Sequence, residues 1–150
     1  MQITKEPNKI LHKKLEPVGE ITPEILELIE EMRKTMIEAK GVGLAANQVG
    51  KDLQIFIIDK KIAEEHKVPD AYINPEMNEF SRDKDEMEEG CLSMPDYWRQ
   101  IPRSKKVRLK ALDEHGNKIK LKARGFLARI FQHEYDHLQG TLIKDRLLRD

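Results

Sequence analysis

The sequence contains a single cysteine, no long apolar run and no excess of either charge. A lone cysteine cannot form an internal disulfide, so Cys91 is a small buried apolar residue, a reactive thiol or a metal ligand. No segment is apolar for long enough to span a bilayer, and the first residues lack the apolar region and cleavage site of a signal peptide. We therefore expect a protein of the cytoplasm, or of another reducing compartment, without a membrane partner.

The charges are balanced, with 27 lysines and arginines against 27 aspartates and glutamates. A net charge of zero gives no electrostatic reason to expect direct binding to nucleic acid or to an anionic membrane. The most polar run, residues 81–89, is expected to be a solvated loop or a strand edge rather than a domain boundary. There is no internal repeat and no low-complexity tract, so we expect residues 1–150 to form one domain with its own core.

Two segments have the apolar periodicity of helices. Thr22 is a good N-cap and is followed by proline, and apolar residues then recur every three or four positions. Gly41 is expected to end this helix. A second helix is predicted from about residue 125 to residue 138, with Gly140 as its C-terminal stop. Its apolar residues lie on more than one side, so this helix should be central and buried.

Strands are predicted between and beside these helices. Residues 53–59 are rich in branched and aromatic residues, and residues 71–74 form a short strand that Pro75 is expected to stop. Residues 107–111 and 119–123 alternate apolar with polar around a turn, which is typical of a hairpin with one wet face. The predicted fold class is α+β, with antiparallel sheets packed around the central buried helix and with an N-terminal helix.

The predicted central helix carries an H-E-x-x-H motif at residues 133–137. Residues four apart share one helix face, so His133 and His137 can direct imidazole nitrogens at one metal ion. Glu134 is offset around the helix, where it can reach a metal-bound water without being a ligand. A surface helix with chance histidines is disfavoured, because buried histidines and a buried glutamate need partners that offset their desolvation.

A third ligand has to come from elsewhere in the chain. In metzincins a histidine lies six residues after the second one, but Ile143 stands at that position here. No glutamate follows His137, as thermolysin-like proteases would require. Of the carboxylates nearby, Asp136 points away from the histidine face and Asp145 lies in a polar tail. An isolated cysteine is more often structural, yet beside an H-E-x-x-H motif Cys91 becomes the strongest candidate.

Three segments, in order, resemble the defining motifs of the peptide deformylase family: residues 41–48 (GVGLAANQ), 89–93 (EGCLS) and 132–138 (QHEYDHL). The resemblance covers nearly the whole chain, and three motifs in the right order are far more specific than one. Asn47 departs from the proline or threonine that is more usual in the family. The sequence also ends soon after the third motif, where many bacterial members continue into a further helix, so ribosome docking through such a tail is not implied.

The resemblance implies a hydrolase that removes the formyl group from the N-terminal formyl-methionine of new polypeptides and releases formate. It implies that a divalent metal ion with one bound water is held by Cys91, His133 and His137. Glu134 would take a proton from that water and later deliver a proton to the leaving amine. Ferrous iron is implied as the natural ion, and zinc, nickel or cobalt as substitutes, because one thiolate and two imidazoles accept any of them.

The same resemblance implies how substrate is held. The oxyanion would be bound by the metal, by the side-chain amide of Gln48 and by the backbone N–H of Leu92. The substrate backbone would pair like an added strand with Val42, Gly43 and Gly90.

The methionine side chain needs an apolar slot, and by position we suggest Val42, Trp98 and Ile130 for its walls. Arg103 is either the ion-pair partner of Glu89 or a solvated surface charge.

The implied partners are nascent formyl-methionyl polypeptides and, transiently, the ribosome. A zinc endopeptidase of the H-E-x-x-H type is the alternative function, and it would tolerate replacement of Cys91. A non-catalytic binding module on a degenerate deformylase scaffold is a second alternative, against which the retention of Glu134, Gln48 and all three ligands argues. The other histidines are expected to be solvated residues rather than ligands: His12, His66 and His115.

Overall fold

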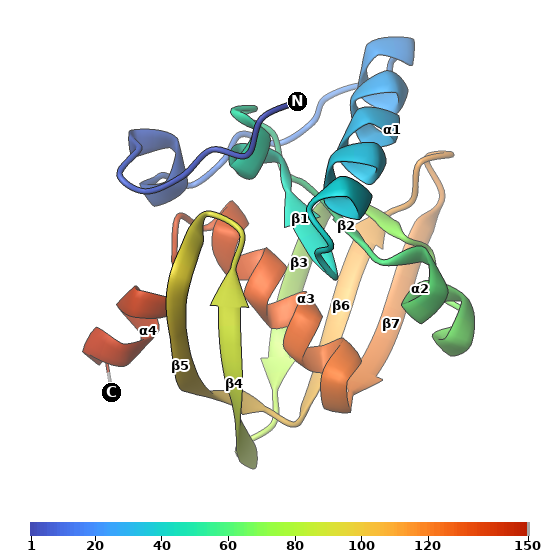
Figure 1. The fold of residues 1–150 in the computed structure, drawn as a ribbon. Helices are drawn as coiled ribbons and strands as arrows, with labels where there is room; N and C mark the ends of the chain where they lie inside the picture. The colour runs from blue at the N-terminus through green and yellow to red at the C-terminus, as the bar shows by residue number, and fades with distance from the viewer. Residues whose placement is uncertain (150) are drawn as a thin grey trace.

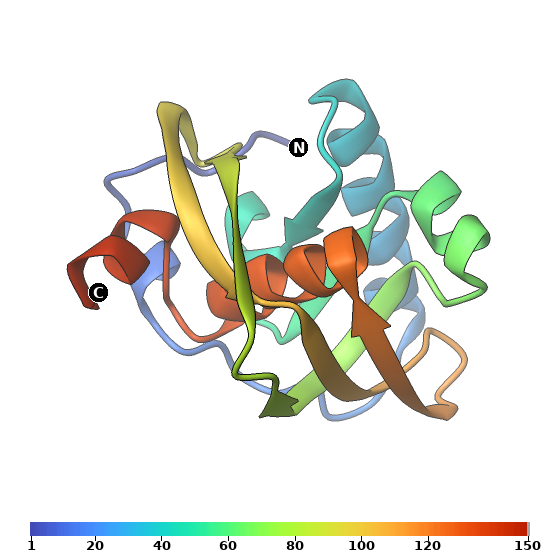
Figure 2. The same cartoon turned by 90° about the horizontal axis from the view of Figure 1, so that it is seen from below.

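The computed structural model describes residues 1–149, with the side chains of residues 1–146. Its strands form two antiparallel sheets, and α3 (Gly125–Leu138) runs between them (Figures 1 and 2). The larger sheet has five strands in the order β1-β2-β3-β6-β7, and the smaller sheet consists of β4 and β5. The prediction of an α+β fold with antiparallel sheets is thus confirmed.

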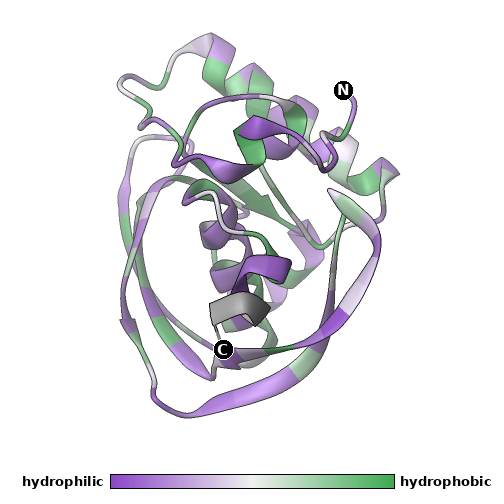
Figure 3. Ribbon diagram, turned by 90° about the vertical axis from the view of Figure 1, so that its left-hand side faces the viewer, coloured by the Kyte–Doolittle hydropathy of each residue, from purple (hydrophilic) through white to green (hydrophobic). Residues whose placement is uncertain are grey.

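The five-stranded sheet contains the predicted hairpin. Gly116 in its turn has a φ of 83°, a left-handed conformation that glycine adopts at little cost. Along both strands of the hairpin, buried or half-buried apolar residues alternate with exposed ones, as a sheet with one wet face requires. Figure 3, seen from the left-hand side of Figure 1, shows short hydrophobic stretches among longer hydrophilic ones along the curved strands on that side. The strands of this sheet are β1 (Gly43–Ala45), β2 (Ile55–Ile58), β3 (Ala71–Phe80), β6 (Lys106–Leu112) and β7 (Lys118–Arg124).

The smaller sheet pairs β4 (Lys84–Cys91) with β5 (Met94–Ser104). The segment 81–89, for which a loop or a strand edge was predicted, turns after β3 and then forms most of β4. The first five residues of β4 are exposed. Four of these five residues are lysine or acidic, types that are depleted in strands, so the strand signal of this part of β4 was weak.

Two apolar cores hold the larger sheet between helices. On one face Phe131 of α3 packs edge-on against Tyr72, which in turn stacks on Phe56. On the other face α1 (Pro23–Glu38) packs against β1 and β2. The predicted stop of α3 at Gly140 is confirmed: this residue has a φ of 76° and follows the C-cap directly.

The start of α1 was predicted correctly, but its end was wrong by one residue. The hydroxyl of Thr22 accepts a hydrogen bond from the backbone N–H of Ile25 at 3.3 Å. At the other end Lys40, not Gly41, adopts the left-handed conformation, with a φ of 57°. The N–H of Gly41 then bonds the carbonyl of Met36 at 3.0 Å, which completes a Schellman motif. Gly41 serves packing instead, because a Cβ there would lie 2.9 Å from the Leu92 side chain.

Pro75 does not stop β3, contrary to prediction. The pairing of β3 with β6 shifts register between Ile73 and Glu76, and Asn74 has a φ of 50°. This bulge removes Pro75 from the ladder, so its missing N–H costs no cross-strand hydrogen bond. The side chain of Asn74 bonds the backbone N–H and carbonyl of Val18, both at 2.8 Å, which fixes the bulge against the N-terminal segment.

Four short helices were not predicted. The α2 helix is capped by Asp59, whose carboxylate accepts from the N–H of Ile62 at 3.2 Å. A further helix occupies the region expected to be a polar tail, and Asp145 within it accepts from the N–H of Leu142 at 2.8 Å. None of the described helices combines the length and the apolar character that crossing a bilayer needs. The four helices are η1 (Lys9–His12), η2 (Ala46–Val49), α2 (Lys60–His66) and α4 (Ile143–Arg149).

Candidate metal centre

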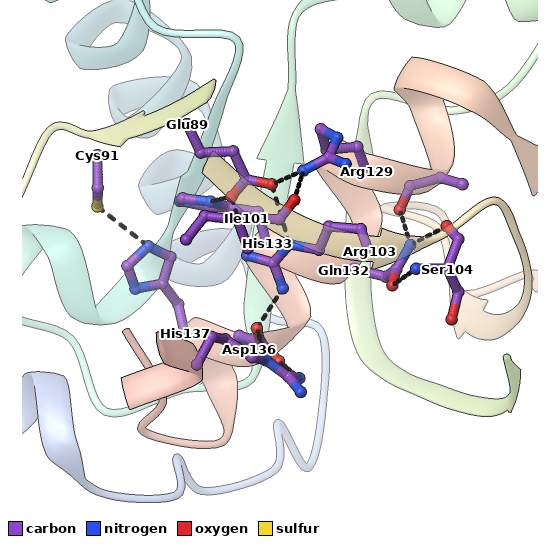
Figure 4. Close-up of polar contacts among 12 residues, drawn as sticks. Glu89, Cys91, Ile101, Arg103, Ser104, Arg129, Gln132, His133, Asp136 and His137 are labelled. Carbon is purple, nitrogen blue, oxygen red and sulfur yellow. Dashed lines mark hydrogen bonds and ion pairs between the residues drawn. The ribbon is translucent and has the colours of Figure 1, made fainter. Parts of the chain in front are cut away.

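Three side chains with metal-binding atoms meet where the end of β4 passes α3. The sulfur of Cys91 lies 3.3 Å from Nε2 of His137 (Figure 4). The imidazoles of His133 and His137, one turn apart on α3, have ring centroids separated by 5.0 Å. The ligand atoms of the three residues lie within 4.8 Å of one another, and the described residues contain no other such cluster. The three predicted metal ligands are thus brought together.

Glu89 orients one of these imidazoles. Its Oε1 lies 2.9 Å from Nδ1 of His133. A carboxylate at one ring nitrogen places the proton there and leaves the other nitrogen, Nε2, free to bind a metal. Burial would raise the pKa of Glu89, but His133 and Arg103 outweigh burial and hold that pKa well below its ordinary value. Glu89 is therefore ionised at neutral pH.

The electrostatics of Cys91 favour a thiolate. Burial alone would raise the pKa of its thiol, whereas His137 and His133 together lower that pKa well below its usual range. The thiolate is the form that binds metals. One thiolate and two imidazoles are a donor set for a divalent ion with one position left open, and buried charges of this kind need such a partner. The residues present therefore fit a metal ion.

Glu134 lies beside this cluster, close to β1. Its Oε1 is buried and has no hydrogen-bond partner among the described residues. A Cβ added to Gly43 would lie 2.5 Å from Oε2 of Glu134, so only glycine lets the strand pass the carboxylate this closely. Burial raises the pKa of Glu134. A carboxyl group with a raised pKa is suited to accepting and returning a proton near neutral pH.

The amide of Gln48 is held in one orientation at the same cluster. Its Oε1 accepts from the backbone N–H of Ala45 at 3.0 Å. Its Nε2 is thereby turned toward the sulfur of Cys91, at 3.6 Å, and toward the hydroxyl of Ser93, at 3.2 Å. The hydroxyl of Ser93 in turn donates to the carbonyl of Thr4 at 2.6 Å. Gln48 therefore presents donors to the space around the sulfur.

A network of buried ion pairs holds the carboxylate of Glu89 in place (Figure 4). Arg103 donates to both carboxylate oxygens of Glu89, at 2.9 and 3.0 Å, and to Asp136 at 2.5 Å. Arg129 also bonds Glu89. Of the two roles considered for Arg103, the ion pair is the correct one. The roles of Arg129 and Asp136 in this network were not predicted. Charged residues inside an otherwise apolar helix are nevertheless a signal for buried ion pairs.

A cleft leads to the metal cluster, and apolar side chains surround it. Val42, Trp98 and Ile130, which were suggested as pocket walls, all line this cleft. Met87 and Phe126 line it as well and were missed. These two side chains are 44% and 46% exposed, so the cleft presents apolar surface to solvent. In the sequence, the only sign that Met87 belongs to the pocket is that it is a single apolar residue within an acidic segment.

The backbone beside Cys91 also lines the cleft, at Gly90 and Leu92. A Cβ at Gly90 would lie 2.6 Å from the ring of Trp98, so the glycine allows the indole to lie across β4. The remaining histidines lie away from the cluster. His66 and His115 are exposed, whereas His12, expected to be merely solvated, bonds Glu6 at 2.6 Å.

Comparison with known proteins identifies the family. The sequence model of the polypeptide deformylase family matches residues 1–150 of the chain. The chain belongs to the polypeptide deformylase family. Curated deformylases include that of Halothermothrix orenii, which is 45% identical over 99% of this chain and 94% of its own length. The deformylase of Chromohalobacter salexigens is 40% identical over 98% of this chain and 85% of its own length.

Solved deformylase structures have the same fold. The crystal structure of the Thermotoga maritima deformylase superposes with a TM-score of 0.89 at 39% identity, covering 97% of this chain and 95% of the other. The Synechococcus elongatus deformylase, solved in complex with actinonin, gives a TM-score of 0.90 at 36% identity, covering 97% and 79%. Membership of this metal-dependent hydrolase family supports the predicted enzyme over the zinc endopeptidase.

The three deformylase motifs form one site in the fold. Residues 41–48 form β1 and η2, residues 89–93 include the end of β4, and residues 132–138 form the last two turns of α3. All three contribute to the cleft at the Cys–His cluster. Segments far apart in the sequence therefore build the site that the family resemblance anticipated.

Proposed function

We propose that this chain removes the N-formyl group from formyl-methionine at the N-terminus of newly synthesised polypeptides and releases formate. The observation that carries this proposal is the meeting of Cys91, His133 and His137 beside the buried carboxylate of Glu134. Family membership supports the same substrate.

Cys91, His133 and His137 hold a divalent metal ion, with ferrous iron as the natural ion and zinc, nickel or cobalt as substitutes. When bound, the ion supplies a Lewis acid that lowers the pKa of water and polarises the formyl oxygen. Glu89 keeps His133 in the tautomer that ligation needs. The network of Arg103 and Arg129 keeps Glu89 ionised and in place.

Glu134 moves the protons. It accepts one proton from the attacking water, whose oxygen adds to the formyl carbon, and passes a proton to the amine nitrogen as the C–N bond breaks. A buried carboxyl group with a raised pKa can carry out both transfers near neutral pH. Its position against Gly43 keeps the carboxylate directed at the cluster.

Two donors stabilise the charge that develops on the formyl oxygen. The Nε2 group of Gln48, already oriented by Ala45, is one donor. The backbone N–H of Leu92, which follows Cys91 directly, is the other. Removal of one donor of this type typically lowers turnover by about two to three orders of magnitude.

The cleft provides the methionine site. Val42, Trp98 and Ile130, together with Met87 and Phe126, supply an apolar wall for an unbranched thioether side chain. Val42, Gly43 and Gly90 line the cleft, and their backbone pairs with the substrate as an added strand.

The setting of the reaction follows from its substrate. We propose that residues 1–150 act as one catalytic domain in the cytoplasm and contact the ribosome transiently while the nascent polypeptide emerges.

An anaerobic assay on formyl-Met-Ala-Ser, with iron-loaded and zinc-loaded protein, tests the function. Formate release is expected from both forms, with metal analysis of the same samples giving one ion per chain. Glu134→Gln should lower kcat by about 10²–10⁴-fold while the metal content stays the same. The matched control is Glu86→Gln, which makes the same charge change at an exposed position of β4 and should leave kcat unchanged.

Two results would contradict this proposal. The first is full turnover by Glu134→Gln. The second is hydrolysis of internal bonds in an unformylated peptide, together with metal binding by Cys91→Ala, because that pair of results would favour the endopeptidase.

A further inference from the structure

The outer face of the β6–β7 hairpin consists of cations. Every exposed, outward position along the two strands is lysine or arginine. The net charge of the whole chain is zero, so this surface is a local concentration of positive charge that the composition conceals. The seven residues, called the basic face below, are Lys106, Arg108, Lys110, Lys118, Lys120, Lys122 and Arg124.

The strand register sets like charges opposite one another. Lys110 is paired directly with Lys120, and the next two pairs toward the open end of the hairpin are also cation with cation. Like charges directly opposite each other destabilise a sheet. Of the seven cations, only Arg108 forms an ion pair among the side chains that the structure describes, with Glu79 at 2.7 Å. On its other side β6 is paired with β3, where Glu76 lies opposite Lys110 and Glu79 opposite Arg108. The repulsion within the basic face is therefore offset in part along β6, but not along β7, whose four cations have no acidic residue opposite them.

Protection of a sheet edge does not account for this arrangement. Lysines on β7, the edge strand, are a familiar guard against unwanted strand pairing. The cations of β6 lie inside the sheet, where no edge needs protection, and the glutamates of β3 are fewer than the cations beside them. A surplus of positive charge in two adjacent rows is what a ligand with many negative charges would select.

The basic face is also uncovered. The α3 helix packs on the opposite face of β6 and β7, and α1 packs on β1 and β2 (Figures 1 and 2). A hollow at the open end of the hairpin is bordered by two opposed cation pairs, Arg108 with Lys122 and Lys106 with Arg124. Glu79 of β3 also lines this hollow, and with Glu76 it is the acidic neighbour of the β6 row. A larger group of acidic residues lies along β4, which borders the catalytic cleft.

We propose that the basic face binds the phosphate backbone of structured RNA. Same-face residues recur about every 6.6–6.8 Å along a strand, and neighbouring strands lie about 4.8 Å apart, which gives two adjacent rows of charge suited to a linear polyanion. Leu112 at the end of the β6 row is half-buried, and no exposed position of either row carries an apolar side chain. Stable docking of a protein on a membrane needs inserted apolar groups or a lipid anchor. The choice of RNA over DNA rests on the proposed function, because nascent polypeptides emerge from an RNA-rich particle.

Fluorescence anisotropy with a short RNA duplex and the metal-loaded enzyme tests the proposal. Binding is expected with a Kd of about 1–100 μM at physiological salt, the range of sequence-independent electrostatic binding. If about five phosphates are neutralised, log K should fall against log salt with a slope of about −4.5. The double variant Lys110→Glu/Lys120→Glu should weaken binding at least about tenfold and reduce the slope by about 2.

The matched control is Lys9→Glu/Lys14→Glu, which makes the same charge change at exposed positions of the N-terminal segment, on the other side of the molecule (Figure 1). This control should bind RNA like the parent enzyme. Both double variants should hydrolyse a formyl-Met peptide at the parent rate, so loss of RNA binding is distinguishable from failure of the proposed catalysis. Equal weakening by both variants, tighter binding to duplex DNA than to RNA, or binding to anionic vesicles but not to RNA would overturn the proposal.

Discussion

Gly43 is required by one contact, the carboxylate of Glu134. A Cβ at position 43 would lie 2.5 Å from Oε2 of Glu134, whereas the backbone of Gly43 has no positive φ that alanine would resist. Gly43→Ala should therefore fold but displace the carboxylate. We expect kcat on a formyl-Met peptide to fall about 100-fold, the typical cost of misplacing a catalytic group by about 1 Å. Steady-state kinetics with metal analysis of the same sample measure the effect.

The control for this substitution is Gly19→Ala, because a Cβ at Gly19 would meet no atom within 4 Å. It should leave kcat and metal content unchanged. Parent-like turnover by Gly43→Ala would mean that the position of Glu134 against β1 does not matter to the reaction.

The ligands and the base were predictable because their chemistry depends on local spacing. His133 and His137 are four residues apart on a helix, and Glu134 lies between them, so the helical repeat alone sets their geometry. Cys91 required elimination of other ligands and the family resemblance. Arg129 was not predictable as a partner of Glu89, because which distant carboxylate a buried arginine meets is decided by tertiary packing and not by the neighbouring sequence.

Asn47 links two elements of the site, η2 and the end of α3. Its Nδ2 donates to the carbonyl of His137 at 2.8 Å and to that of Ile10 at 3.4 Å, and the side chain is fully buried. Asn47→Ala should lower the free energy of unfolding by about 1–2 kcal/mol, from the lost hydrogen bond and the lost packing. Urea denaturation of the metal-free protein measures this change. Asn78→Ala, at an exposed position, should change stability by less than about 0.5 kcal/mol; an equally small effect at Asn47 would contradict the proposed link.

The β6–β7 hairpin should become more stable when its charge repulsion is relieved. Lys120→Glu places an acidic residue directly opposite Lys110. Replacing a like-charge pair with an opposite-charge pair should raise the free energy of unfolding by about 0.2–1 kcal/mol. The gain should shrink at high salt, which screens exposed charges. Urea denaturation at low and high salt measures it, with Lys14→Glu as a control of equal charge change; an equal gain in that control would attribute the effect to net charge.

Elements with strong periodicity were predictable, and those set by tertiary contacts were not. The hairpin of β6 and β7 and the span of α3 matched their patterns closely. The end of α1 was misplaced because Lys40 accepts a left-handed conformation that the prediction assigned to a glycine. Pro75 was read as a strand stop because the bulge that accommodates it is stabilised by Asn74 and Val18, which are far apart in the sequence.

At the scale of the whole molecule, the metal centre joins two substructures that otherwise share few apolar contacts. Cys91 comes from the β4–β5 sheet, and both histidines come from α3, which belongs to the main core. Most of β4 is exposed, and the β4–β5 sheet contributes only three residues, Cys91, Met94 and Ile101, to a small apolar cluster of its own with η1 and α4. Segments with few buried apolar contacts are those that open at low free energy. An ion bound by both substructures should therefore stabilise the smaller sheet most.

Removal of the metal tests whether the ion stabilises the β4–β5 sheet more than the larger sheet. A ligand that binds only the folded state adds about 4 kcal/mol when its free concentration is roughly 1,000 times its Kd, so a chelator should lower Tm markedly. Hydrogen exchange should quicken more around residues 87–94 than in β6 and β7, because only the former segment carries a ligand. Cys91→Ala supplies the control, since it should show fast exchange in the smaller sheet with or without added metal. Uniform loss of protection across both sheets would instead mean that the ion stabilises the fold as one cooperative unit.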